Sequence, residues 1–268
     1  MQKVRPNLER GCPDPRALLS PEIDARKATD IIARIKIGGV FKTTSDDRYP
    51  MTTQLLAGTT FASRPVVVDV GASDGSASLS VINAMRFSRY YVTDRHIYAY
   101  ACHTRKGVFF CDADLVPFMF ANRFFVVYND TGEASSLQSG MVARLFGGFD
   151  ASRCKHVRKV ALMNRALLPR LGNDIRLERY SIFDAWPFEK ADLVIAANIL
   201  NRSYFPDTRL CEAMRNLRGA LKESGRLAII ENRRIEQSNI FRLVDGRFVV
   251  ENEVGGGSDI KSLVTDLS

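Results

Sequence analysis

A glycine-rich turn between an apolar run and a helical segment is the clearest chemical feature of this 268-residue sequence. The run VVVDV ends at residue 70 and is followed by Gly71, Ala72, Ser73 and Gly75. Small residues let the backbone approach a ligand closely, and the first N–H groups of a helix carry partial positive charge. The turn therefore predicts a binding site for either the pyrophosphate of a dinucleotide or a carboxylate.

Three aspartates lie at the ends of three predicted strands, in chain order. Asp69 stands at the end of the first, Asp94 ends the second 25 positions later, and Asp184 follows the third. The negative charge of Asp69 would repel a pyrophosphate, whereas the carboxylate of Asp94 can accept hydrogen bonds from both hydroxyls of a ribose. Each aspartate alone could be a turn or helix cap. Together they favour a ligand that contains a nucleoside.

These residues need a scaffold of alternating strands and helices. Short apolar runs predict strands at 65–70, 89–94, 175–183, 191–200 and 226–232. Helical spacing predicts helices at 76–87, 156–171 and 207–224. Asp245-Gly246 between two apolar runs predicts a tight hairpin, so the expected fold is α/β, a doubly wound and mostly parallel sheet with an antiparallel finish.

The segment VVVDVGASDGSASL at 66–79 resembles motif I of class I S-adenosylmethionine (SAM)-dependent methyltransferases, with Ser73 in place of the middle glycine. Residues 191–205 and 220–233 resemble the fourth-strand and fifth-strand motifs of that family, so the resemblance covers roughly 65–235. The segment ANIL at 197–200 resembles the chemotaxis-receptor (CheR-type) methyltransferases to some extent. The resemblance implies a seven-stranded Rossmann-like sheet, SAM as cofactor and S-adenosylhomocysteine as product.

The resemblance also implies roles for particular residues. Asp184 would accept a hydrogen bond from the adenine amino group, with Ile182 or Phe183 packing on the ring, and Asn198 would face the methionine part. The predicted cofactor-binding residues are Asp69, Gly71, Ala72, Ser73, Gly75, Asp94, Arg95, Ile182, Phe183, Asp184 and Asn198.

The methyl acceptor is expected beyond the fourth strand, near Asn201, Arg202 and Tyr204. The methyl group of SAM is already activated, so transfer to an O or N atom depends mainly on alignment, and a general base is needed only if the acceptor keeps its proton. Asn201, Tyr204 and His96 are the candidate catalytic residues, although His96 could simply face solvent.

Two segments fall outside this pattern. Residues 1–64 predict an N-terminal helical extension or lid, with a helix from Ser20-Pro21 to Gly38-Gly39, ahead of a SAM-binding domain at 65–268. Residues 97–150 predict an inserted β-rich segment with two added strands. We expect these two segments to determine which acceptor binds. The aromatic residues of 108–128 would line a pocket or a homodimer contact.

Composition narrows the class of protein. The net charge is +8, and residues 151–173 are basic without an acidic residue, which suits a phosphate-bearing partner but is more often a solvated helix face. No apolar run is long enough for a membrane span, the N-terminus lacks a secretory signal, and the five cysteines form no CxxC pair. These features predict no metal site and a cytoplasmic protein.

The favoured acceptor is therefore a small molecule or a saccharide or lipid precursor. A nucleic acid is possible but not favoured, because an Asn-Pro-Pro-Tyr motif is absent. The alternatives are a methyltransferase that acts on protein or RNA, a non-catalytic SAM-fold binding subunit and an NAD-dependent oxidoreductase.

Overall fold

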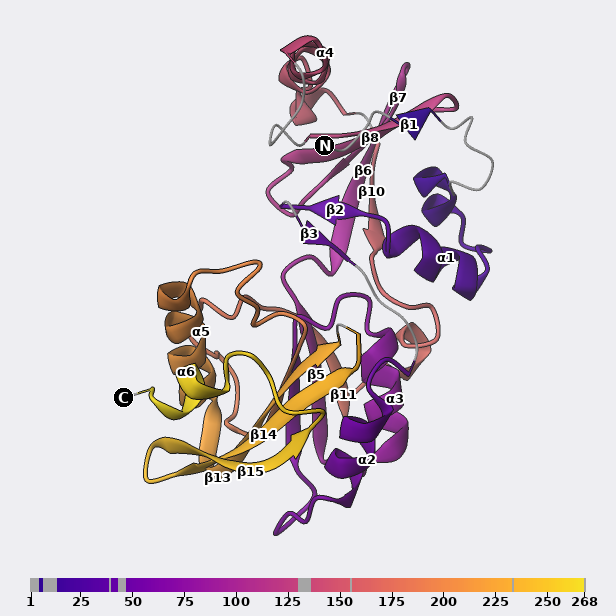
Figure 1. Cartoon of the computed structure of the whole chain (residues 1–268). Helices are drawn as coiled ribbons and strands as arrows, with labels where there is room; N and C mark the ends of the chain where they lie inside the picture. Colours follow the sequence, from indigo (N-terminus) through magenta and orange to yellow (C-terminus); the bar gives the residue numbers. More distant parts are fainter. Residues whose placement is uncertain are drawn as a thin grey trace. The chain divides into compact units, whose positions relative to one another are not determined.

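The computed structural model describes residues 5–6, 14–38, 40–42, 47–129, 136–154, 156–232 and 234–267 (Figure 1). The chain divides into two compact units. Residues 1–43 and 96–166 form one, called here the β unit, and residues 44–95 and 167–268 form the other, the α/β unit. The N-terminal 64 residues are thus shared between the units, and residues 97–150 belong wholly to the β unit.

The α/β unit contains a seven-stranded sheet in the order β11-β5-β4-β12-β13-β14-β15. Its strands are β4 (Val66–Val70), β5 (Arg89–Asp94), β11 (Ile175–Arg179), β12 (Ala191–Ala197), β13 (Leu221–Asn232), β14 (Glu236–Val244) and β15 (Arg247–Val254). The first five in the sheet run parallel, β14 is antiparallel to β13, and β15 is antiparallel to β14. The predicted mostly parallel α/β sheet is confirmed.

Helices cover both faces of this sheet, as the prediction of a doubly wound fold requires. Helices α2 (Pro50–Gly58) and α3 (Ser76–Ala84) lie on one face, and α5 (Asp207–Ala220) and α6 (Lys261–Thr265) lie on the other (Figure 1). All five residues of β4 are buried, which explains its continuous apolar run.

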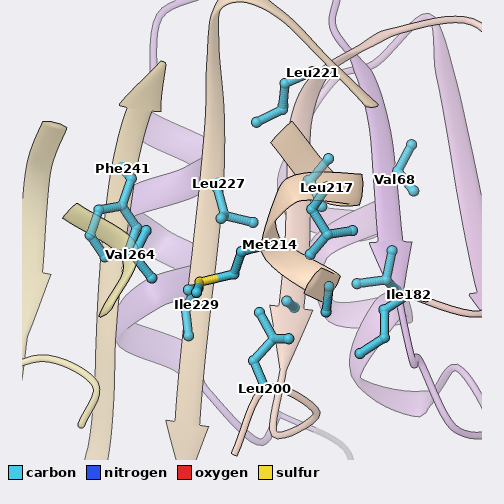
Figure 2. Packing of buried hydrophobic residues seen from close by; sticks show 14 of the residues in the cluster. Val68, Ile182, Leu200, Met214, Leu217, Leu221, Leu227, Ile229, Phe241 and Val264 are labelled. Carbon is cyan, nitrogen blue, oxygen red and sulfur yellow. The ribbon is translucent and has the colours of Figure 1, made fainter. Parts of the chain in front are cut away.

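In the core beneath α5 and α6, residues on one face of each helix pack against the sheet. Met214 and Leu217, three positions apart on α5, meet Ile229 of β13 and Phe241 of β14, and Val264 of α6 closes the cluster (Figure 2). This packing holds α5 against the sheet.

The predicted hairpin at Asp245-Gly246 is confirmed. The two residues have φ of 49° and 74° and join β14 to β15, and positive φ at both positions is what the tight hairpin turn requires. The glycines that follow β15 lead into helix α6. A Cβ atom on Gly255 would lie 2.1 Å from the backbone oxygen of Glu236, so the loop packs directly on β14.

The β unit is built on a six-stranded antiparallel sheet in the order β1-β9-β8-β7-β6-β10. Its strands are β1 (Arg5–Pro6), β6 (Tyr98–Thr104), β7 (Gly107–Cys111), β8 (Pro117–Ala121), β9 (Phe125–Tyr128) and β10 (Val157–Ala161). A separate two-stranded sheet pairs β2 (Lys36–Ile37) with β3 (Val40–Phe41).

Neighbouring residues of β7 point to opposite faces of this sheet. Phe110 packs with Ile31 and Ile32 of helix α1 (Ala25–Ile32), and Phe109 packs with Val142 and Phe146 of helix α4 (Ser136–Gly147). Three short 3-10 helices complete the described elements, η1 (Pro15–Leu19) in this unit, η2 (Ala151–Arg153) before β10, and η3 (Leu168–Arg170) in the α/β unit.

Three sequence predictions for these segments are wrong. The helix expected at 156–171 is the edge strand β10 followed by η3, because pairing with β6 satisfies its backbone in place of helical hydrogen bonds. The insertion contributes four strands, β6 to β9, where two were expected. The N-terminal helix begins at Ala25, capped by the Asp24 carboxylate, which accepts the Lys27 N–H, and not at Ser20-Pro21.

The aromatic residues expected to line a pocket or a dimer contact mostly form the two cores of the β unit. Phe110 and Phe118 belong to the core under α1, and Phe109 and Phe120 to the core under α4. Among them only Phe124, in the turn between β8 and β9, is largely exposed, at 57%.

Candidate functional site

The turn after β4 takes a backbone conformation that suits small residues. Gly71, Ser73 and Gly75 all have positive φ, at 65°, 59° and 79°. A Cβ atom on Gly71 would lie 2.3 Å from Cδ1 of Ile199 and 3.2 Å from its Cβ, so this position has no room for a side chain. The Ala72 N–H donates to the Thr93 oxygen at 2.9 Å, which fastens the turn to β5.

Asp94 lies directly against this turn. The Ser73 N–H donates to Asp94 Oδ2 at 3.0 Å, which joins the loop after β4 to the carboxyl end of β5. The Ser73 hydroxyl oxygen is buried and has no hydrogen-bond partner among the described residues. A polar group of this kind can be satisfied by a ligand. The structure therefore brings together the turn and the carboxylate that the sequence assigned to a nucleoside ligand.

Helix α3 begins at Ser76, immediately after the turn, so its first N–H groups lie at this point of the unit. Asp74, which the sequence analysis did not select, is fully buried and accepts from the Ser76 N–H and from Ser76 Oγ, both at 2.9 Å. This contact with the N–H two positions later is an Asx turn just ahead of the helix, whose N-cap residue is Gly75. Asp74 thus fixes the start of α3.

Asp69 is buried behind the turn, with 1% of its surface exposed. Its Oδ2 accepts from Ser78 Oγ at 2.7 Å and from Tyr90 Oη at 3.1 Å. Burial raises the pKa of Asp69 to about 6, an effect larger than the lowering of that pKa by these two hydrogen bonds. Asp69 therefore ties β4, α3 and β5 together and carries negative charge behind the turn near neutral pH. Ser78 and Tyr90 are not among the predicted site residues, because their residue types alone gave no signal.

The residues after β11 divide into buried and accessible ones. Ile182 is 4% exposed and belongs to the core under α5, so in this structure it presents almost no surface to a ligand. Phe183 is half-buried, with the Arg209 guanidinium 3.8 Å from its ring centre and the Phe205 ring at 5.1 Å. Asp184 is exposed, and its backbone oxygen accepts from Tyr180 Oη at 3.0 Å. Phe183 is thus the better placed of the two candidates for packing on a ring.

The end of β12 carries the remaining candidates of this unit. Asn198 has φ of 57°, and its Oδ1 accepts from the Asn232 N–H at 2.8 Å, which joins the ends of β12 and β13. Asn201 Oδ1 accepts from the Ser203 N–H at 2.7 Å and forms a turn. Tyr204 is 51% exposed. Asn198 and Asn201 therefore shape the loop, and Tyr204 offers an exposed hydroxyl.

Arg202 is held by its own unit. Its guanidinium pairs with the Asp207 carboxylate at 2.9 Å and donates to the Asp259 backbone oxygen at 2.7 Å. The hydrogen bond with Asp207 and the negative charge of that group raise the pKa of Arg202 above its ordinary value. Arg202 thus connects the loop after β12 to the segment before α6.

Arg95 and His96 lie where the chain passes from one unit to the other. Arg95 is exposed and ends the first segment of the α/β unit, while His96 is the first residue of the second segment of the β unit. The His96 backbone oxygen accepts from Lys42 Nζ at 2.9 Å. His96 is thus the one predicted site residue that belongs to the β unit.

Within the described ranges, no helix is both long and apolar enough to cross a membrane. No group of three or more His, Cys, Asp or Glu side chains in the same ranges is placed to hold a metal ion.

Comparison with known proteins gives matches among solved structures. The chain matches no family model and no curated protein. It is similar to LepI in complex with SAM, with a TM-score of 0.38 and 13% identity over 77% of this chain and 35% of that one. It is similar to an O-methyltransferase family protein from Burkholderia thailandensis, with a TM-score of 0.37 and 12% identity over 80% and 42% of the two chains. The mitomycin 7-O-methyltransferase MmcR has a TM-score of 0.35 and 13% identity over 81% and 42%. The chain spans less than half the length of each of these three proteins.

Proposed function

We propose that this protein is a class I SAM-dependent methyltransferase whose α/β unit binds the cofactor at the carboxyl ends of β4, β5 and β11. One observation carries the proposal: the hydrogen bond from the Ser73 N–H to Asp94. This contact joins a small-residue turn, the start of a helix and the carboxylate that we propose binds the ribose. In open α/β sheets, ligands bind at this edge.

The residues present fit the cofactor in several respects. Gly71 leaves the backbone open to close approach, and the buried Ser73 hydroxyl lacks a partner among the described residues. In our proposal the turn and the first N–H groups of α3 hold the carboxylate of the methionine part, and Asp94 accepts the ribose hydroxyls. Phe183 packs beside the adenine ring, and Asp184 lies next to it.

Asp69 favours SAM over a dinucleotide. With a pKa of about 6, its buried carboxyl group is mostly ionised at pH 7 and above. A negative charge behind the turn opposes a pyrophosphate and favours a ligand that carries an amino group and a sulfonium. The same charge disfavours the alternative of an NAD-dependent oxidoreductase.

When bound, SAM supplies a methyl group that is already activated for transfer. What remains for the protein is to orient an acceptor and to exclude water. We propose that Tyr204, exposed after β12, contacts the acceptor, while Asn198 and Asn201 shape the loop that carries it. The proposed acceptor atom is an O or N of a small molecule or of a saccharide or lipid precursor, and the proposed compartment is the cytoplasm.

Titration calorimetry with SAM on the Asp94→Ala variant tests the proposal. Loss of the ribose hydrogen bonds should cost about 2–4 kcal/mol, or a ~30- to 1,000-fold weaker Kd. Because Asp94 also accepts from the Ser73 N–H, Asp94→Asn serves as a second variant that keeps an oxygen for this bond. Asp266→Ala, an exposed aspartate at the end of α6, is the matched control and should bind SAM like the wild type. Full SAM affinity in a folded Asp94→Ala protein would remove the ribose site from the proposal.

A further inference from the structure

The two units differ sharply in charge. Residues 1–43 and 96–166, the β unit, contain 18 Lys and Arg against 10 Asp and Glu. Residues 44–95 and 167–268, the α/β unit, contain 20 of each. The whole net charge of +8 therefore resides in the β unit, which is the smaller of the two.

The topology of the β unit gathers part of this charge at one end of its sheet. In an antiparallel sheet the β6–β7 turn, the β8–β9 turn and the start of β10 all lie at the same end. Two distances agree with this. The β6–β7 turn lies close to the β8–β9 turn, because a Cβ atom added to Gly107 would lie 2.6 Å from the Ala121 oxygen. The end of β6 lies close to the start of β10, because the His103 N–H donates to the His156 oxygen at 3.4 Å. We call this region the basic end. Its basic side chains are Arg105, Lys106, Arg123, Arg153 and Arg158.

These side chains are available to a partner. Arg105, Lys106 and Arg158 are exposed, and none of them forms an ion pair with another residue in the part of the chain that the structure describes. Arg153 pairs with Asp150 at 3.1 Å, yet its side chain remains 85% exposed. The opposite end of the sheet is different, because the β7–β8 turn there carries Asp112 and Asp114.

An exposed aromatic ring accompanies the cations. Phe124 lies at the tip of the β8–β9 turn with 57% of its surface exposed, and the Arg123 guanidinium lies 4.4 Å from its ring centre. Asn122 Oδ1 accepts from the Phe124 and Phe125 N–H groups at 2.8 and 3.0 Å and so fixes the turn. Arg123 covers one face of the ring, which leaves the other for stacking.

We propose that the basic end binds single-stranded nucleic acid, with phosphates on its arginine and lysine side chains and a base stacked on Phe124. Three neighbouring segments of a sheet, with strands about 4.8 Å apart, spread the cations along a row, which suits a chain of phosphates better than one phosphate group. Cations combined with an exposed aromatic ring are the usual means of binding single strands. The inference goes beyond the proposed function, since it adds a ligand and does not depend on methyl transfer.

An anionic membrane surface would attract the same cations, but the apolar side chains argue against it. Among the described residues of the basic end, the large apolar side chains that are exposed are Phe124 and Val157. Interfacial binding to a bilayer scales with buried apolar area, and two side chains provide little. The membrane is therefore an outcome of the test and not part of the proposal.

The test measures binding of fluorescein-labelled 20-nucleotide oligo(U) RNA, and of DNA of the same length, to the full chain by fluorescence anisotropy. If four phosphates are neutralised, the affinity should fall about 50-fold between 50 and 200 mM salt. The double reversal Arg105→Glu/Lys106→Glu should weaken binding at least ~10-fold at 50 mM salt and make the salt dependence shallower. The matched control Arg242→Glu/Arg247→Glu changes the net charge equally on exposed positions of the α/β unit, and should bind like the wild type.

Phe124 gives a test that net charge does not affect. Phe124→Ala should weaken binding about 5- to 100-fold through loss of a stacked base, and Phe124→Trp should retain it. Three results would overturn the proposal: no binding of either oligonucleotide, equal losses in the basic-end variant and its control, or binding to phosphatidylserine vesicles without binding to RNA or DNA. Binding that is salt-sensitive but indifferent to Phe124→Ala would overturn the stacking part.

Discussion

The α/β unit and the β unit use polar residues in opposite ways. In the α/β unit the candidate site is held by internal contacts, such as Asp69 with Ser78 and Tyr90, and Asp94 with the Ser73 N–H. In the β unit the conspicuous charges are exposed at one end of a sheet whose two faces are filled by aromatic and aliphatic cores. The contrast teaches that one chain combines a unit of zero net charge, whose polar side chains bond to one another, with a basic unit whose charged side chains are exposed to solvent.

We expect substitutions at the candidate site of the α/β unit to lower the free energy of unfolding strongly. Substitutions of exposed charges in the β unit should change it little. The largest effect is expected at Gly71. Its φ of 65° disfavours any side chain. The Cβ of a valine would also lie 3.2 Å from both Cβ and Cγ1 of Ile199. Rotation of the terminal methyl group of Ile199 would not relieve these two contacts. Gly71→Val should lower the free energy of unfolding by about 2–5 kcal/mol in urea denaturation and abolish SAM binding.

Gly246 provides the control for Gly71. It also has positive φ, at 74°, but nothing lies within 4 Å of the position its Cβ would take. Gly246→Ala should therefore cost only the backbone strain, about 1–2 kcal/mol. Equal losses in the two variants would show that the turn after β4 is not the tightly packed element described above.

The second effect concerns the buried charge of Asp69. Its pKa in the folded state is raised from 3.8 to about 6, so the folded protein holds the proton more tightly than the unfolded chain. The resulting stabilisation is complete below about pH 4 and is lost as pH rises through 6, a difference on the order of 3 kcal/mol between pH 4 and pH 7. Asp69→Asn should lack this decline when urea denaturation is measured at several pH values.

Asp266→Asn is the control for Asp69, because Asp266 is exposed and should leave the pH dependence of the wild type unchanged. A pH dependence in Asp69→Asn identical to that of the wild type would mean that Asp69 does not titrate as a buried group. In that case Asp69 could no longer serve as the example of a buried charge that distinguishes the α/β unit from the β unit.

The smallest effect is expected in the β unit. Lys159 Nζ lies 3.7 Å from the centre of the Tyr98 ring on the exposed edge strand β10. Lys159→Ala should lower the free energy of unfolding by about 0.5–1 kcal/mol, the size of an exposed cation–π contact. Lys106→Ala, which removes an exposed cation from the β6–β7 turn, should change it by less than about 0.5 kcal/mol. A loss of 3 kcal/mol or more at Lys159 would contradict the view that the charges of this unit are structurally dispensable.

Much of the α/β unit could be predicted from the sequence because its signals are local. The run VVVDV is buried on both faces, Asp245-Gly246 needs positive φ at both positions, and the small residues of 71–75 form a tight turn. Each property follows from a few neighbouring residues. Boundaries were less accurate: the helix expected at 207–224 ends at Ala220, because β13 begins at Leu221.

The β unit could not be predicted in the same way because long-range pairing decides its structure. Residues 157–161 contain as many basic as β-branched side chains, and only their pairing with β6 makes them a strand. The same pairing converts the expected basic helix face into an edge strand, and Lys155, which belongs to that basic run, lies outside the described residues. In the candidate site, the burial of Ile182 and the partners of Asp69 likewise depend on elements far apart in the sequence.

The central claim is that the turn after β4 and Asp94 form a site for SAM and not for a dinucleotide. Titration calorimetry of the wild-type full chain with S-adenosylhomocysteine and with NAD, at pH 7.5 where Asp69 is ionised, tests it most directly. We predict saturable binding of S-adenosylhomocysteine with one site per chain and no heat of binding with NAD. Binding of NAD without binding of S-adenosylhomocysteine would contradict this claim.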